Sequence, residues 1–175
     1  MANFSDVGTV TATLGRIECQ KVDVIVNSAH RSLFRGSGVC GAIHGAAGIE
    51  LEAHCKSLGP CEVGEFVVTP AFQLPAKWII HTVMPKLAVG EKMDQQALFD
   101  LERQFRSIFA KAYTLGARSI AIPPLGIGGH RLPIVSTLEA LASSAYAADR
   151  ILGLDVHFVS TEPTYVELFS SLSQF

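Results

Sequence analysis

Short apolar runs alternate with longer amphipathic segments along the whole chain. The short runs are rich in β-branched residues and end at polar residues, glycine or proline, which is typical of buried strands. They predict strands over residues 7–14, 22–27, 64–70, 77–83, 119–123 and 155–160. The longer segments, in which apolar residues recur every three or four positions, predict helices over residues 39–57, 94–115, 133–151 and 163–172. This alternation favours an α/β fold with a largely parallel sheet covered by helices on both faces.

Two glycine-rich segments each lie between a predicted strand and the helix that follows it. The first is Gly36-Ser37-Gly38, and the second is LGIGGHR, residues 125–131. Ligands of open α/β sheets bind beyond the carboxyl ends of the strands. Glycine lets backbone N–H groups approach a ligand closely, and a helix N-terminus adds free N–H groups and partial positive charge. The two segments could therefore hold a diphosphate without lysine, although glycines also form tight turns where no ligand binds.

The composition is that of a well-buried domain with little net charge. The chain has 175 residues, of which 49% are apolar and 17% charged, and its net charge is -2. This length suits one domain with a substantial core, so residues 1–175 are predicted to form a single domain. The absence of a basic block argues against tight non-specific binding to nucleic acid. The oligomeric state is left open by these properties.

The four cysteines indicate a reduced, cytoplasmic protein. Cys19, Cys40, Cys55 and Cys61 contain no C-x-x-C pair, and no Cys/His group has the sequence spacing of a zinc site. We therefore expect free, mostly buried thiols, no bound metal and no cofactor. No apolar run is long enough to span a bilayer, and the N-terminus lacks the basic and apolar segments of a signal peptide, so we expect no membrane association.

Four segments carry a resemblance to the macro domain family. They read VDVIVNSAH, GSGVCGAIHGAAG, IIHTVMP and SIAIPPLGIGG, and they occur in the order that is typical of that family. The resemblance extends over about residues 8–170. It implies a three-layer α/β/α fold around a central mixed, mostly parallel sheet. It also implies a cleft for ADP-ribose, with the diphosphate between the two glycine loops.

The resemblance also implies a set of ligand-binding residues. Residues 36–39 match the family's first phosphate loop, residues 126–129 match the second, and Ile17 matches the residue beside the adenine. The complete predicted set is Ile17, Ala29, His30, Gly36, Ser37, Gly38, Val39, Cys40, Leu125, Gly126, Ile127, Gly128, Gly129 and His130.

One departure from the family pattern affects the base. The family's G-D-I-T segment reads Gly15-Arg16-Ile17-Glu18 here, and in the family that Asp accepts a hydrogen bond from the adenine amino group. Arginine carries only donors and cannot replace it. Arg16 could instead stack on a base, meet a phosphate, or be an exposed surface residue. We therefore expect weak selectivity for adenine.

Two further departures affect catalysis. His30 replaces the family's ribose-contacting Asn, and Cys40 stands where mono-ADP-ribosyl hydrolases place Asp. A neutral thiol is a poor substitute for a carboxylate base, so Cys40 is either activated by the helix N-terminus or a small apolar filler. His130 stands about where another branch places a hydrolytic Asp, so His30 and His130 are the candidate catalytic residues. His44 and His81 are predicted to be structural histidines with hydrogen-bonded rings.

Three functions remain open from the sequence. The first is hydrolysis that removes ADP-ribose from a modified side chain, or an acyl group from O-acyl-ADP-ribose. The second is binding of ADP-ribose, or of an ADP-ribosylated protein, without turnover. The third is a macro-type module for a different nucleotide or RNA; loss of the adenine Asp favours it, although the net charge does not favour RNA. The replaced Asn and Asp favour binding over hydrolysis, so slow or absent turnover is expected.

Overall fold

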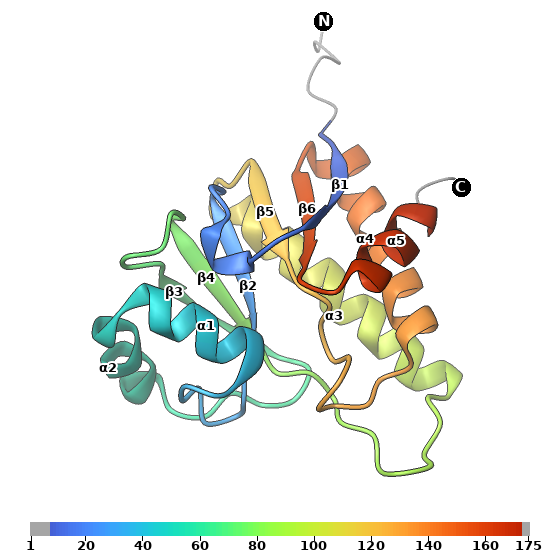
Figure 1. Cartoon of the computed structure of the whole chain (residues 1–175), viewed down its shortest axis with the longest axis horizontal. Helices are drawn as coiled ribbons and strands as arrows, with labels where there is room; N and C mark the ends of the chain where they lie inside the picture. Colours follow the sequence, from blue (N-terminus) through green and yellow to red (C-terminus); the bar gives the residue numbers. More distant parts are fainter. Residues whose placement is uncertain (1–7, 173–175) are drawn as a thin grey trace, which may run out of the picture.

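The computed structural model describes residues 8–172, which form a six-stranded sheet between layers of helices (Figure 1). The strands are β1 (Val10–Leu14), β2 (Val24–Ser28), β3 (Phe66–Pro70), β4 (Trp78–Thr82), β5 (Ser119–Ile122) and β6 (Asp155–Ser160). Their order across the sheet is β1-β6-β5-β2-β4-β3, and every neighbouring pair is parallel except β3 with β4. The prediction of a mixed, mostly parallel sheet is confirmed. Residue 7, the first of the predicted strand 7–14, lies outside the described residues.

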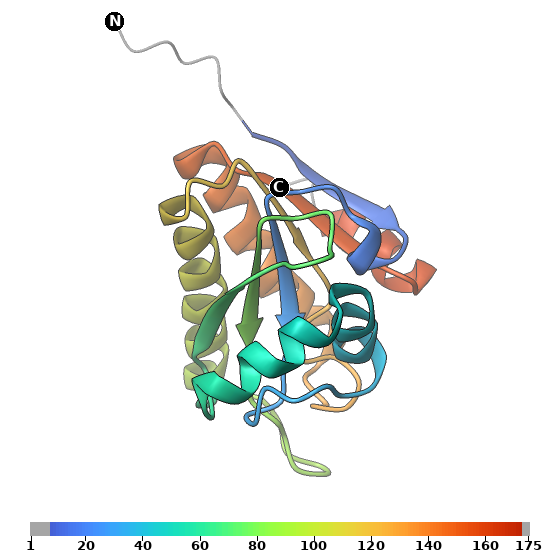
Figure 2. The same ribbon diagram turned by 90° about the vertical axis from the view of Figure 1, so that its left-hand side faces the viewer.

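The helices form a layer on each face of this sheet. They are the short 3₁₀ helix η1 (Ile17–Cys19) and the α-helices α1 (Gly38–Ala47), α2 (Ile49–Leu58), α3 (Gln95–Thr114), α4 (Ile134–Leu152) and α5 (Pro163–Ser171). α1 and α2 cover one face, and α3 and α4 cover the other (Figures 1 and 2). The predicted three-layer α/β/α arrangement is therefore confirmed. None of the helices within residues 8–172 has both the length and the apolar character needed to cross a membrane.

The central strand β2 shows why its sequence is apolar without alternation. Val24, Ile25 and Val26 are all fully buried. Val24 and Val26 belong to the core cluster under α3 and α4, whereas Ile25 belongs to the cluster under α1 and α2. A parallel strand inside the sheet is covered on both faces, so each of its side chains needs to be apolar. Burying each such side chain contributes about 1.5–3 kcal/mol.

The helix predicted over residues 39–57 is two helices, and the prediction of one continuous helix is wrong. Gly48, with φ at 92°, ends α1 and precedes the first residue of α2. A Cβ atom at this position would lie 2.7 Å from the Gln73 side-chain amide nitrogen, so glycine suits both the backbone and the packing. The sequence pattern does not reveal this break, because the helical spacing of apolar residues continues across Gly48. Ile43, Ala47 and Leu51 all face the same core cluster.

The strand order places an opening between β2 and β5. The chain leaves β2 through α1 on one face and reaches β4, whereas it leaves β5 through α4 on the other face and reaches β6 on the opposite side. Neighbouring parallel strands whose connections diverge in this way leave a crevice at their carboxyl ends. Both glycine loops lie at this crevice, because residues 29–37 follow β2 and residues 123–133 follow β5.

Candidate functional site

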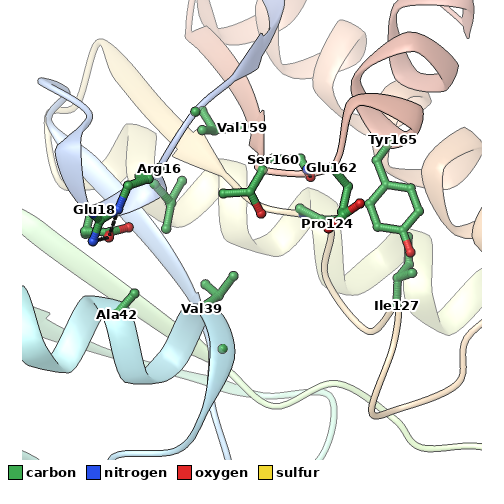
Figure 3. Close-up of a pocket in the computed structure, with 14 residues that line it drawn as sticks. Arg16, Glu18, Val39, Ala42, Pro124, Ile127, Val159, Ser160, Glu162 and Tyr165 are labelled. Atoms are coloured by element: carbon green, nitrogen blue, oxygen red, sulfur yellow. Dashed lines mark hydrogen bonds and ion pairs between the residues drawn. The ribbon is translucent and has the colours of Figure 1, made fainter.

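A pocket of about 390 Å³ lies at the carboxyl edge of the sheet (Figure 3). Four segments that are distant in sequence form its walls: the end of β1 with η1, the start of α1, the loop after β5, and the junction of β6 with α5. The lining residues are Gly15, Arg16, Ile17, Glu18, Gly38, Val39, Ala42, Pro124, Ile127, Val159, Ser160, Thr161, Glu162 and Tyr165. The pocket therefore has a mostly apolar wall with a few polar groups, which is the usual character of a small-molecule site.

The first glycine loop presents the N-terminus of α1 to this pocket. Ser37 is the N-cap residue, but its side chain makes no capping hydrogen bond, and the first turn contains no acidic residue. The N–H groups of a first helical turn have no acceptor within the helix, so they are available to an anion. Gly38 lines the pocket at φ 56°, with no atom within 4 Å of the position a Cβ would take. The loop therefore offers backbone donors and open space together.

The second glycine loop combines a packed glycine with an open one. A Cβ at Gly126 would lie 2.3 Å from Leu132 Cδ1. The absence of a side chain at Gly126 therefore leaves room for the Leu132 side chain to pack against the loop. Gly128 has φ at 90° and open space around its Cα. The loop is held by hydrogen bonds from the Leu132 N–H to the Gly126 carbonyl and from the Arg131 N–H to the Gly128 carbonyl. Of these two glycines, Gly128 is the one placed to approach a ligand.

Comparison with known proteins identifies the family of this chain. The model of the Macro domain family matches residues 26–141, which contain both glycine loops. The chain belongs to the macro domain family. The resemblance seen in the sequence is therefore confirmed.

Individual relatives add detail to this membership. An uncharacterised protein of Fusobacterium nucleatum is 42% identical over 114 residues, which are 65% of this chain and 63% of that protein, so the chain spans less than two thirds of this relative. The O-acetyl-ADP-ribose deacetylase of Klebsiella pneumoniae is 43% identical over 150 residues, 79% of this chain and 84% of the relative. A mutant of the Oceanobacillus iheyensis macrodomain, solved with ADPR (ADP-ribose), has a TM-score of 0.86 and 27% identity, covering 98% of this chain and 94% of that chain.

The structure brings some of the predicted macro-domain residues into the pocket and leaves others behind it or at its edge. Ile17, Gly38, Val39 and Ile127 line the pocket. Buried behind the loops are Ala29, Cys40, Leu125 and Gly126, whereas His30, Gly36, Ser37, Gly128 and Gly129 are exposed and His130 is half-buried. The sequence missed the wall formed by Val159, Ser160, Thr161, Glu162 and Tyr165. Only the three-dimensional proximity of β1 and β6, whose residues pair in parallel, indicates this wall.

His30 and His130 are held in different ways. The Ser32 N–H donates to His30 Nδ1 at 3.2 Å, and the Ser32 hydroxyl lies 2.9 Å from the same nitrogen. Because Nδ1 accepts from the backbone, the ring hydrogen of neutral His30 belongs on Nε2, where it can donate. Burial lowers the pKa of His130, with smaller contributions from Lys86 and His30. His130 is thus neutral at pH 7 and suits a base, whereas His30 suits a hydrogen-bond donor.

Cys40 is buried beneath the first loop. Its Sγ lies 3.7 Å from Asn27 Nδ2 and 3.8 Å from the carbonyl oxygen of Phe34, distances at which sulfur makes weak hydrogen bonds. It is 7% exposed and does not line the pocket. Of the two interpretations from the sequence, this position suits the small apolar filler.

A buried polar cluster lies beneath the site. Asn27 Nδ2 lies 3.0 Å from His81 Nδ1, and Thr69 Oγ1 lies 3.0 Å from His81 Nε2. Burial lowers the pKa of His81 to about 3. The prediction of a hydrogen-bonded structural histidine is therefore confirmed for His81. For His44 it is wrong, since neither ring nitrogen of this buried residue has a hydrogen-bond partner in the described part of the chain.

His44 and His81 also meet Cys55 in this cluster, with one potential ligand atom of each within 4.8 Å of the others. Sequence spacing did not reveal this group, because the three residues come from α1, α2 and β4. Metal binding would require His81 to give up one of its two hydrogen bonds. It would also require a Cys55 thiolate, and burial raises the pKa of this thiol to about 11. The cluster as described is better suited to a structural role.

Arg16 is exposed but is fixed to a neighbour. Its Nε donates to Glu18 Oε1 at 2.7 Å, and its Nη2 lies 2.5 Å from the same oxygen (Figure 3). The Arg16 side chain is 69% exposed, whereas the Glu18 side chain is 5% exposed. Among the alternatives for Arg16, the structure shows a largely solvent-exposed side chain whose guanidinium is paired with a carboxylate of the pocket wall.

Proposed function

We propose that this macro domain binds ADP-ribose in the pocket, with the diphosphate between its two glycine loops. The observation that carries the proposal is that Gly38, at the uncapped N-terminus of α1, and Ile127, in the second loop, line one pocket. The relative solved with ADP-ribose supports the same ligand. The deacetylase relative supports an ADP-ribose derivative as the substrate class.

The charges around the pocket favour recognition by backbone groups. Arg16 is the only lysine or arginine among the lining residues, and its guanidinium is already paired with Glu18. A diphosphate would therefore depend on N–H groups of the loops and on the partial positive charge of the helix terminus. Hydrogen bonds from such donors to an anion are stronger than those between neutral groups.

We extend the proposal to slow hydrolysis of O-acyl-ADP-ribose or of ADP-ribosyl linkages. In the acyl reaction a water oxygen attacks the acyl carbon, and His130 accepts the proton of that water. The bond from the acyl carbon to the ribose oxygen then breaks, and the ribose oxygen receives the proton. His30, with its hydrogen on Nε2, orients the ribose through a donated hydrogen bond. The placement of these two histidines beside the crevice supports the assignment.

We propose that residues 1–175 are a single macro domain, which the pairing of β1 with β6 from opposite ends of the chain supports. We propose a cytoplasmic location, which the four free cysteines support.

Calorimetric titration with ADP-ribose and with adenosine tests the binding proposal. Adenosine lacks the diphosphate, so it should bind at least about tenfold more weakly if the loops hold that group. Equal affinity of the two ligands would contradict the assignment of the glycine loops, and absence of binding by ADP-ribose would refute the proposal as a whole.

A further inference from the structure

The pocket wall contains the Glu18 carboxylate, of which only one oxygen is bound by another residue within the range 8–172. Both contacts from Arg16 reach Glu18 Oε1, and none of the described residues donates a hydrogen bond to Oε2. Glu18 lines the pocket, and its side chain is 5% exposed. Oε2 therefore keeps its full accepting capacity toward the pocket, and an N–H group of a ligand at this end would be bound favourably, because hydrogen bonds to a charged acceptor are among the stronger ones.

The surroundings of Glu18 limit the kind of ligand group that fits there. Ile17, Val39, Ala42 and Val159 form apolar surfaces in the same pocket. Figure 3 labels the last three of them. A flat, mostly apolar ring that carries an amino group at its edge would match these surfaces together with the acceptor. A second phosphate or a carboxylate would be repelled by Glu18 instead.

We propose that Glu18 selects adenine by accepting a hydrogen bond from its amino group at Oε2, with Arg16 as the positioning residue that holds Oε1. This inference rests on the proposed function, because ADP-ribose carries adenine beyond the diphosphate that the loops would bind. The role follows from the pairing geometry, since Arg16 fixes one oxygen and leaves the other for the ligand. It replaces the weak adenine selectivity expected from Arg16 alone with a definite preference for a base that has an amino donor.

Glu162 supplies a matched control. It lines the same pocket at the start of α5, and it is exposed, unlike Glu18. Its backbone N–H donates to Ser160 Oγ, so the local backbone is held independently of its carboxylate. Removing each carboxylate in turn therefore separates a specific acceptor from a general effect of negative charge.

The test compares two ligands that differ only in the amino group. ADP and purine riboside 5′-diphosphate are titrated against the wild-type protein by calorimetry. ADP should bind about tenfold more tightly or better, as expected for a hydrogen bond to a charged acceptor. Equal and measurable affinities would overturn the inference and leave diphosphate binding intact. Absence of binding by both ligands would remove the proposed function and this inference with it.

Variants then assign the preference to a residue. Glu18→Met should reduce the preference to about threefold or less by weakening ADP alone, whereas Glu162→Met should leave it unchanged. Arg16→Met should lower the preference partly, and Arg16→Lys should restore some of it, which a purely structural role would not produce. An undiminished preference in folded Glu18→Met would overturn the inference. Should Glu18→Met not fold, the wild-type comparison of the two ligands still decides.

Discussion

The rim of the crevice and the layer buried beneath it use the same residue types for different purposes. At the rim, Gly38 and Gly128 face open space, whereas inside α1 a Cβ at half-buried Gly41 would lie 2.5 Å from the Gly36 carbonyl oxygen. Half-buried His130 lies at the rim, and His81 is fully buried with both ring nitrogens hydrogen-bonded. The surroundings rather than the residue type therefore decide whether a glycine or a histidine contributes to ligand binding or to the fold.

Changing the rim histidine should have the largest effect, and it should affect rate rather than stability. We expect His130→Ala to lower acetate release from O-acetyl-ADP-ribose by about a hundredfold, the usual loss for a general base. His30→Ala should cost less, because His30 donates rather than accepts. In wild type the rate should rise with pH through a pKa below the ordinary histidine value and then level off, since burial lowers the pKa of His130. A wild-type rate that neither substitution reduces would contradict the assignment of both residues.

The buried histidine should instead make the fold sensitive to acid. Burial lowers the pKa of His81 to about 3, well below its value in the unfolded chain. Between these values the unfolded state binds a proton that the folded state does not. The contribution of this group to stability is therefore complete above about pH 6.5 and falls by up to about 1.4 kcal/mol per pH unit below it.

Denaturant unfolding at several pH values between 7 and 4 measures this dependence. The slope of stability against pH should be shallower in His81→Gln than in wild type, whatever the absolute stability of the variant. Equal slopes in the two proteins would show that His81 is not buried in its neutral form. The pKa of His44 is also lowered by burial, so part of the slope should persist in the variant.

Gly41, inside α1, tests packing alone, and the sign of the stability change is informative. Alanine is favoured over glycine inside a helix by about 1 kcal/mol, so Gly41→Ala on an unstrained helix would stabilise. Here the new Cβ meets a backbone oxygen, and we expect a net destabilisation of about 1–3 kcal/mol, as for overpacking. The midpoint of urea unfolding measures it. Gly45→Ala, in the same helix beside the movable end of Arg35, serves as the control, and a stabilised Gly41→Ala would contradict the close contact.

The fold and the site could be predicted from the sequence where they depend on residues close together in the chain, and not where they depend on contacts between distant segments. The strands were predictable because β2 and its neighbours are buried on both faces, and the glycine loops because a local motif follows each strand. The break between α1 and α2 at Gly48 could not be predicted, because the core-facing spacing of Ala47 and Leu51 continues across it. The wall around Tyr165 was missed because pairing of β1 with β6 is a long-range contact. Glu18 was named in the sequence beside Ile17, but its place in the pocket wall and its pairing with Arg16 appear only in three dimensions. Departures such as Arg16 could be seen in the sequence, but their consequences depend on the partner found in three dimensions.

In the proposed function, the open glycines of the crevice let the backbone bind the diphosphate. Calorimetric titration of ADP-ribose into Gly128→Glu and Gly64→Glu tests it most directly. Both glycines have positive φ, 90° and 85°, and neither has an atom within 4 Å of the Cβ position, so the two substitutions should strain the fold similarly. Gly64 lies just before β3, outside both glycine loops. Neither glycine lines the pocket itself, but Gly128 directly follows Ile127 of the second loop, which does. Gly128→Glu should lose ADP-ribose binding while Gly64→Glu retains it, and an unchanged affinity in folded Gly128→Glu would show that the loop backbone does not bind the diphosphate.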